Sequence, residues 1–232
     1  MLTKDLLLAI LKLTMDTDQL GLEDLCRAVR MPAAKVRICV EDLAGQGALV
    51  LRQHLVSVDV EKRLSIAIMA LREGADLERV CRLLSWQEFE EIAVRSLCAN
   101  GYSVFKHFVF KSNDHRREID VIGVGQNLVV CLDCKHWMKG IRGTVGEKIA
   151  ARQIERVQGL VQSAESGSRL GISTRRTLYF VPAIVSLFGT GPRFISQVPI
   201  VPVLKLNSFL SSLDPFVEGL FTVCMKGQSE LD

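Results

Sequence analysis

Two neighbouring apolar runs constrain the fold of this chain more than any other feature of its sequence. Residues 118–124 and 128–135 are rich in Val, Ile and Leu, and residues 125–127 between them favour a turn. We therefore expect the two runs to form an antiparallel β-hairpin. The second run is uniformly apolar over residues 129–132, as a strand inside a larger sheet is, and an edge strand would not be.

Charged residues interrupt this hairpin at Asp120, Asp133 and Lys135. Side chains alternate between the faces of a strand, so Asp133 and Lys135 share one face, roughly 7 Å apart. A loop of two or four residues places Asp120 directly across from Asp133, whereas a loop of three residues places the two carboxylates on opposite faces. Paired carboxylates repel each other across strands. A divalent cation bound between them would remove that repulsion.

These three residues are suited to a magnesium site that hydrolyses phosphodiesters. Mg²⁺ prefers oxygen ligands and commonly takes one or two carboxylates together with substrate phosphate oxygens. The ion would lower the pKa of a bound water, and Lys135 would orient that water or stabilise developing charge. We predict Mg²⁺ as the cofactor, with Mn²⁺ as a substitute. The alternative, an exposed Asp133–Lys135 ion pair on an edge strand, conflicts with the apolar flanks.

A predicted helix and strand precede the hairpin. Ser85 and Glu88 fit a capping box at the start of a helix, whose apolar stripe runs from Phe89 to Leu97 and which Gly101 ends. Residues 101–104 then lead into a strand. This order resembles the restriction-endonuclease-like nucleases with D…(D/E)xK sites, most closely the Mrr-like nucleases and archaeal Holliday junction resolvases. The resemblance covers residues 85 to about 165 well and the remainder loosely.

The resemblance implies an α/β (α+β) fold, with a mixed central sheet flanked by helices. It also implies that Asp120 and Asp133 are metal ligands, that Lys135 is the catalytic lysine and that Glu90 is a third acidic ligand. Glu88 and Glu91 compete with Glu90 for that role, and an ordinary solvated glutamate is the alternative. This chain has Asp133 where many family members have Glu, which would shift the metal slightly.

A second helix is predicted over residues 145–165. Gln153 would face the active-site edge of the sheet, as a glutamine does in several of the resembling nucleases. Lys148, Arg152 and Arg156 follow at intervals of four residues and form a basic stripe suited to a phosphate backbone. A solvated helix, with Glu147 and Glu155 as partners of these cations, is the alternative.

The N-terminal third resembles a winged-helix domain in its layout. Helices are predicted over residues 2–15, 22–29 and 33–43, followed by two short strands at 48–51 and 55–58. The third helix would enter the major groove with Lys35 and Arg37. The first 84 residues contain 12 Lys and Arg and 12 Asp and Glu, so both DNA and protein remain candidate partners of this domain. We divide the chain into a winged-helix-like domain (1–59), a helical connector (60–84) and a nuclease domain (85–232).

Composition points to an intracellular protein. The sequence shows no signal peptide and no long apolar run, and its seven cysteines suit reduced thiols. Cys131 and Cys134 have CxxC spacing, but residues three apart on a strand face opposite ways and cannot share a zinc ion. We expect a cytoplasmic or nucleoid-associated protein that is neither secreted nor bound to a membrane.

Two classes of function follow from the sequence. The first is a Mg-dependent DNA endonuclease acting as a homodimer on DNA, of Mrr-like, junction-resolving or repair type. The second is a catalytically inactive protein that keeps the nuclease fold for DNA binding or assembly. The choice of DNA structure and sequence is left open.

Overall fold

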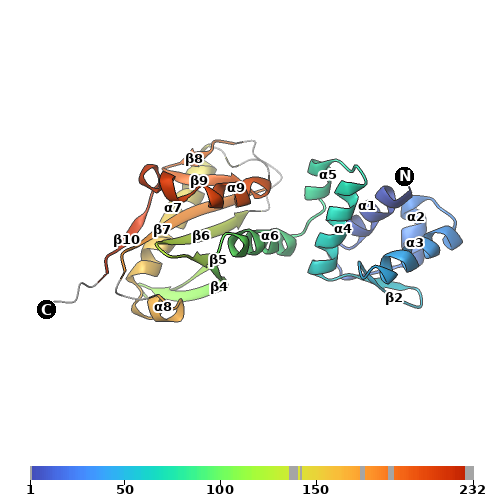
Figure 1. Ribbon diagram of the computed structural model, residues 1–232, viewed down its shortest axis with the longest axis horizontal. Helices are drawn as coiled ribbons and strands as arrows, with labels where there is room; N and C mark the ends of the chain where they lie inside the picture. The colour runs from blue at the N-terminus through green and yellow to red at the C-terminus, as the bar shows by residue number, and fades with distance from the viewer. Residues whose placement is uncertain (1, 136–140, 142, 173–175, 188–190, 228–232) are drawn as a thin grey trace. The chain divides into compact units, whose positions relative to one another are not determined.

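The computed structural model describes residues 2–135, 141, 143–172, 176–187 and 191–227 (Figure 1). The chain divides into two compact units, Met1–Glu88 and Phe89–Asp232. Each unit has its own sheet and its own apolar core.

The first unit is mainly helical, with a small three-stranded antiparallel sheet ordered β1-β3-β2. Its core is formed by buried residues of α1, α2, α3 and α4, and Asp59 and Asp76 cap α4 and α5 by accepting backbone N–H groups. The elements are α1 (Leu2–Leu13), β1 (Gln19–Gly21), α2 (Leu22–Val29), α3 (Ala33–Gly45), β2 (Val50–Arg52), β3 (Leu55–Ser57), α4 (Val60–Arg72) and α5 (Leu77–Cys81).

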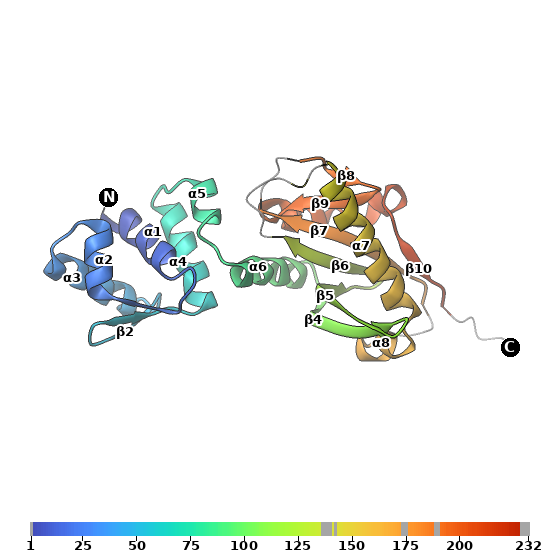
Figure 2. The ribbon, with the colours of Figure 1, turned by 180° about the vertical axis from the view of Figure 1, so that it is seen from behind.

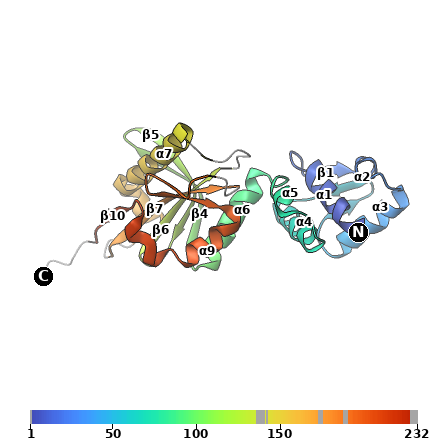
Figure 3. The same cartoon turned by 90° about the horizontal axis from the view of Figure 1, so that it is seen from above.

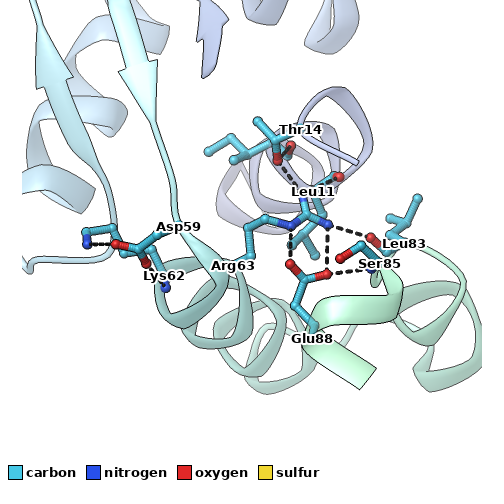
Figure 4. A network of polar contacts seen from close by, with 9 residues as sticks. Leu11, Thr14, Asp59, Lys62, Arg63, Leu83, Ser85 and Glu88 are labelled. Atoms are coloured by element: carbon cyan, nitrogen blue, oxygen red, sulfur yellow. Dashed lines mark hydrogen bonds and ion pairs between the residues drawn. The ribbon is translucent and has the colours of Figure 1, made fainter. Parts of the chain in front are cut away.

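A buried ion pair lies inside the first unit (Figure 4). Arg63 of α4 and Glu88 are 2% and 1% exposed, and the Arg63 Nε lies 2.7 Å from Glu88 Oε1. The Arg63 guanidinium also donates to the carbonyl oxygens of Leu11 and Leu83 and to the Thr14 hydroxyl. The Glu88 carboxylate accepts from the Ser85 N–H, which is one half of the predicted capping box; the Ser85 hydroxyl, which would form the other half, is buried with no hydrogen-bond partner among the described residues.

The second unit is built on a mixed sheet, as predicted. Its strand order is β4-β5-β6-β7-β9-β8, with β10 also paired to β7. The pairs β6–β7 and β7–β9 are parallel, and the other pairs are antiparallel. The strands are β4 (Ser103–Ser112), β5 (His115–Val124), β6 (Leu128–Lys135), β7 (Leu178–Ser186), β8 (Phe194–Ile195), β9 (Val198–Pro202) and β10 (Val223–Met225).

Helices cover both faces of this sheet (Figures 2 and 3). One face carries α7 (Gly143–Gln162), followed by α8 (Ala164–Arg169); the other carries α6 (Trp86–Ala99) and α9 (Leu206–Ser211). Short 3₁₀ helices cover Val203–Lys205 and Asp214–Gly219. The predicted helix over 145–165 is interrupted, because α7 ends at Gln162 and α8 begins at Ala164.

Alternation along β6 fixes which residues face which layer. Val129 and Cys131 pack in one buried cluster with Val157 and Leu160 of α7, so this face of β6 looks toward α7. Asp133 continues the same alternation and lies on the α7 face. An interior strand of the mixed sheet therefore presents its last acidic residue toward α7.

Candidate active site

The turn between β5 and β6 decides how the two central carboxylates meet. Gly125 N–H donates to the Leu128 carbonyl at 2.8 Å, which leaves a two-residue loop of Gln126 and Asn127. The register runs from Val124↔Val129 to Val121↔Leu132. One further step places Asp120 opposite Asp133, as the two-residue alternative predicted.

Asp120 and Asp133 influence each other electrostatically at this point. Burial raises the pKa of Asp120, and the charge of Asp133 raises it further. The backbone N–H of Cys134 donates to Asp120 Oδ2 at 2.8 Å and, with the charges of Lys135 and Arg156, works against that rise. The carboxylates of Asp120 and Asp133 therefore lie close together, with Lys135 and Arg156 nearby.

Asp133 is only 2% exposed and pairs with both cations. Its Oδ1 accepts from Lys135 Nζ at 2.9 Å and from Arg156 NH1 at 2.8 Å. The strand carrying it lies between β5 and β7, so the alternative of an exposed ion pair on an edge strand is wrong.

Arg156 differs from the other two cations predicted for the α7 stripe. Lys148 and Arg152 are exposed on α7, as a DNA-contacting stripe requires. The guanidinium of Arg156 instead points to Asp133, and Glu155 next to it pairs with Arg117 at 2.6 Å. The structure therefore brings Arg156 into the candidate site.

Gln153 lies one helical turn before Arg156 and is fully buried. Its Nε2 donates to the Cys131 carbonyl of β6 at 2.9 Å. Its Oε1 is buried and has no hydrogen-bond partner among the described residues. Gln153 faces the strand of Asp133 and Lys135 and contacts its backbone two residues before Asp133.

Glu90 is the one of the three helix glutamates that remains a candidate for the site. It is 6% exposed, which excludes the alternative of a solvated glutamate. Burial raises its pKa, and the charge of Asp120 is among the further causes. Glu88 is held by Arg63, and Glu91 pairs with Arg95 and Lys106, each at 3.3 Å.

His107 is a neighbour of this site that sequence reasoning missed. It has a φ of +49° inside β4, and its Nε2 lies 3.3 Å from Glu90 Oε2 and its Nδ1 3.1 Å from Glu118 Oε1. The β4–β5 register passes from Lys106↔Val121 to Phe108↔Ile119, which puts His107 beside Asp120. A left-handed non-glycine residue inside a strand is uncommon and strained. No periodicity in the sequence signals it.

The acidic residues fit a magnesium site of two carboxylates. Among the described residues, no group of three or more His, Cys, Asp or Glu side chains is arranged to hold a metal ion by itself. Asp120 and Asp133 supply two carboxylates, which is the number that Mg²⁺ commonly takes beside water and substrate oxygens. Glu90 Oε2 is buried and has no hydrogen bond within the described part of the chain, although it lies within ion-pair distance of His107.

The cations predicted to contact DNA in the first unit lie on α3. Lys35 is exposed. Arg37 is half-buried, lies 3.5 Å from Glu41 and contacts the Gln53 carbonyl and the His54 ring in the β2–β3 turn. Ile38, also on α3, is 65% exposed.

The fold agrees with the family whose model this segment matches. Residues 85–175 match the model of the NERD family, described as a nuclease-related domain. The second unit thus contains a nuclease-related domain, a class with the restriction-endonuclease-like fold.

An archaeal protein extends this match. The chain is 34% identical over 132 residues to a protein of Archaeoglobus fulgidus described as uncharacterized, covering 56% of this chain and 92% of that protein. The chain therefore belongs to one family with this archaeal protein.

Two crystal structures show weaker likeness. One is of a protein of unknown function, AF1548, with 15% identity, 42% of this chain and 46% of that chain covered, and a TM-score of 0.29. The other is of VC1899 from Vibrio cholerae, with 11% identity, 97% and 53% covered, and a TM-score of 0.43. The chain spans about half the length of each. Separately, none of the described helices is long and apolar enough to cross a membrane.

Proposed function

We propose that this protein is a metal-dependent DNA endonuclease that hydrolyses phosphodiester bonds at Asp120, Asp133 and Lys135. One observation carries the proposal. The β5–β6 register, continued one step beyond Val121↔Leu132, brings Asp120 to Asp133 on an interior strand pair, and the charge of Asp133 raises the pKa of Asp120, while Lys135 and Arg156 both contact Asp133. A purely structural hairpin gains nothing from two facing carboxylates, since like charges directly opposite each other destabilise a sheet.

Each side chain has a role that its position supports. Asp120 and Asp133 would hold Mg²⁺ or Mn²⁺, with Glu90 as a third acidic group nearby. The bound ion supplies an activated water and stabilises charge on the phosphate. Lys135 Nζ orients the attacking water or stabilises developing charge. Arg156 adds a guanidinium, suited to phosphate oxygens, at the same carboxylate. Gln153 supports the strand at the Cys131 carbonyl.

DNA contact is proposed for the exposed cations of α7. Lys148 and Arg152 precede Arg156 by eight and four residues, so the three cations occupy successive turns. A DNA backbone that contacts these three cations in turn would lead to Asp133.

We further propose that the protein acts as a homodimer, and that the first unit is winged-helix-like and contacts DNA through Lys35 and Arg37. The exposed apolar side chain of Ile38, on the same helix, favours the alternative that the partner of the first unit is a protein.

The second candidate function is a catalytically inactive nuclease fold that binds DNA or assembles with a partner. The specific observation in its favour is that Asp133 Oδ1 already accepts from two cations. Such a pair neutralises Asp133 without any metal and would stabilise a scaffold. This second candidate function predicts that the purified protein binds DNA and cleaves none of it.

Cleavage assays on several DNA forms separate the two candidates. Linear, junction, flap, single-stranded and methylated substrates are incubated with Mg²⁺ or Mn²⁺, with and without a chelator. We expect metal-dependent cleavage of at least one form, and Lys135→Ala should lower its rate by roughly 100-fold or more.

The matched control for this assay is Glu147→Gln, an exposed change on α7 outside the proposed site. It should cut like the wild type. Absence of cleavage on every form, by a wild-type protein with native circular dichroism, would support the inactive alternative. The form cut fastest identifies a junction-resolving, restriction-type or repair role.

A further inference from the structure

A cavity lies in the nuclease-related unit, beside the end of β7. It has a volume of about 600 Å³ and is lined by residues of β7, β8, β9 and α9 together with residues 141, 191–193, 205 and 212. Ser186 is among the lining residues, and it is the register partner of Lys135 in the parallel β6–β7 pairing. Neighbouring strands lie about 4.8 Å apart. The cavity thus begins one strand away from the proposed catalytic lysine.

The lining of this cavity is basic and rich in hydroxyl groups. Arg193 and Lys205 line it, and none of its described lining residues is an aspartate or glutamate. Both cations are exposed, and neither pairs with a carboxylate among the described residues. Ser208 of α9 and Ser212, which follows that helix, also line the cavity, and the Ser212 hydroxyl donates to the Ser208 carbonyl at 2.9 Å. Two unpaired cations with hydroxyl groups and no acidic residue favour an anionic ligand, such as one carrying phosphate.

An aromatic side chain borders the same cavity. Phe194 of β8 lines it, and 53% of this large apolar residue is exposed. Proteins that hold single-stranded nucleic acid combine cations along the backbone with aromatic rings on which bases stack. Arg193 and Phe194 are adjacent in the chain, so both kinds of contact come from one short segment.

The volume of the cavity limits the size of the ligand that it can bind. Its volume lies in the range of pockets for small ligands, about 300–1,000 Å³, which suits one or two unstacked nucleotides. A double helix keeps its bases stacked inside and would not offer them to such a hollow. A strand end, a flap or an extruded nucleotide would.

We propose that this cavity binds a single-stranded nucleic-acid segment next to the bond that is cut. Its phosphates contact Arg193 and Lys205, and a base stacks on Phe194. This proposal rests on the nuclease function proposed above, and it specifies that function as acting on DNA with an unpaired segment near the scissile bond.

Strand binding is measured without cleavage, so that the cavity and the chemistry are tested apart. The full-length protein is titrated into a fluorescein-labelled oligothymidylate in a chelator, and fluorescence anisotropy is recorded over a range of salt concentrations. Phe194→Ala should weaken binding by about 10-fold. Arg193→Ala combined with Lys205→Ala should lower the slope of log affinity against log salt by about 1.4, since each lost phosphate contact on a single strand removes about 0.7.

A matched control removes two cations from the opposite edge of the sheet. Lys111 and Arg116 are exposed register partners on β4 and β5, and their double alanine variant should bind the oligonucleotide like the wild type. The cavity proposal is overturned if the wild type does not bind the strand, or if the cavity variants bind as tightly as the wild type. It is also overturned if the control variant loses as much affinity as they do.

Parallel cleavage assays keep the two proposals distinguishable. If Lys135→Ala abolishes cleavage while the cavity variants bind normally, the cavity proposal fails and the nuclease function stands. If the cavity variants lose strand binding while the wild type cuts nothing, the cavity is a strand-binding site of an inactive nuclease fold.

Discussion

At the residue scale, Asp120 carries the clearest electrostatic signature of the site. Burial and the charge of Asp133 raise its pKa above the ordinary 3.8. The folded protein therefore binds this proton more tightly than the unfolded chain does. Stability falls as pH rises from about 3.8 through the raised pKa, and above that value the ionised carboxylate is a cost to the fold.

Asp120→Asn removes that cost and should raise the thermal midpoint by a few degrees at neutral pH. The amide oxygen of Asn can still accept from the Cys134 N–H. Below the ordinary aspartate pKa the two proteins should melt together, because Asp120 is then protonated in both the folded and the unfolded state. Thermal melts across pH check this, and a variant that melts lower than the wild type at neutral pH would contradict it.

Metal binding should offset the destabilising effect of the ionised Asp120 carboxylate in the wild-type protein. A cation held by Asp120 and Asp133 binds the folded state alone and would stabilise it by about 2.7 kcal/mol at 100 times its dissociation constant. The midpoint of the wild type should therefore rise with Mg²⁺ or Mn²⁺, and that of Asp133→Asn should rise much less. Equal shifts in both proteins would place the ion elsewhere.

Sequence spacing placed Asp133 and Lys135 on one face, because a strand has a fixed period, but it left the alignment of Asp120 with Asp133 conditional on a turn of two, three or four residues. It was insufficient for Arg156, whose contact with Asp133 depends on how α7 is rotated against the sheet. The place of His107 beside the site could not be predicted from the sequence, since its left-handed conformation coincides with a break in the β4–β5 ladder.

At the element scale, the close approach of α6 to β5 depends on Gly123. A Cβ at this position would lie 2.5 Å from a methyl carbon of Leu97. Gly123→Ala should destabilise the second unit by about 1–3 kcal/mol, the usual cost of overpacking a core, and should displace the helix that carries Glu90. Chemical denaturation followed by circular dichroism measures the change.

Gly167→Ala in α8 is the control for that substitution. It adds the same methyl group where nothing lies within 4 Å, and alanine favours a helix by up to about 1 kcal/mol over glycine. A Gly123→Ala protein as stable as this control would show that α6 packs differently against β5.

The Arg63–Glu88 pair gives a second test between elements. Arg63→Ala leaves the Glu88 carboxylate buried without its partner, which should destabilise the first unit by about 3–5 kcal/mol. Adding Glu88→Gln removes the unpaired charge and keeps an acceptor for the Ser85 N–H, so the double variant should be more stable than Arg63→Ala alone. Urea denaturation measures both. A double variant less stable than the single would contradict the ion pair.

Most elements were predictable from the sequence, because their apolar periodicity is regular. The helices at 22–29 and 33–43 and the two hairpin strands fall within three residues of α2, α3, β5 and β6. The three-residue β1 was missed, since so short a segment has no readable period and is a strand only by pairing with β3. The break at Ser163 lies within a sequence that continues the helical pattern.

At the scale of the whole molecule, net charge is carried by the second part of the chain. The first 84 residues are neutral, and the overall formal charge of +3 therefore comes from residues 85–232. Residues 106–156, which include Asp120, Asp133 and α7 as far as Arg156, contain 10 Lys and Arg against 6 Asp and Glu. This distribution favours DNA contact through the nuclease-related unit.

We propose that Asp120, Asp133 and Lys135 cut DNA with a divalent metal, and plasmid nicking tests this directly. The rate at which supercoiled plasmid is nicked is measured for the wild type and for Asp133→Asn, with Mg²⁺ and with a chelator. We expect Mg²⁺-dependent nicking by the wild type and a loss of roughly 100-fold or more in a folded Asp133→Asn protein. Equal nicking by both proteins, or nicking that persists in the chelator, would contradict it.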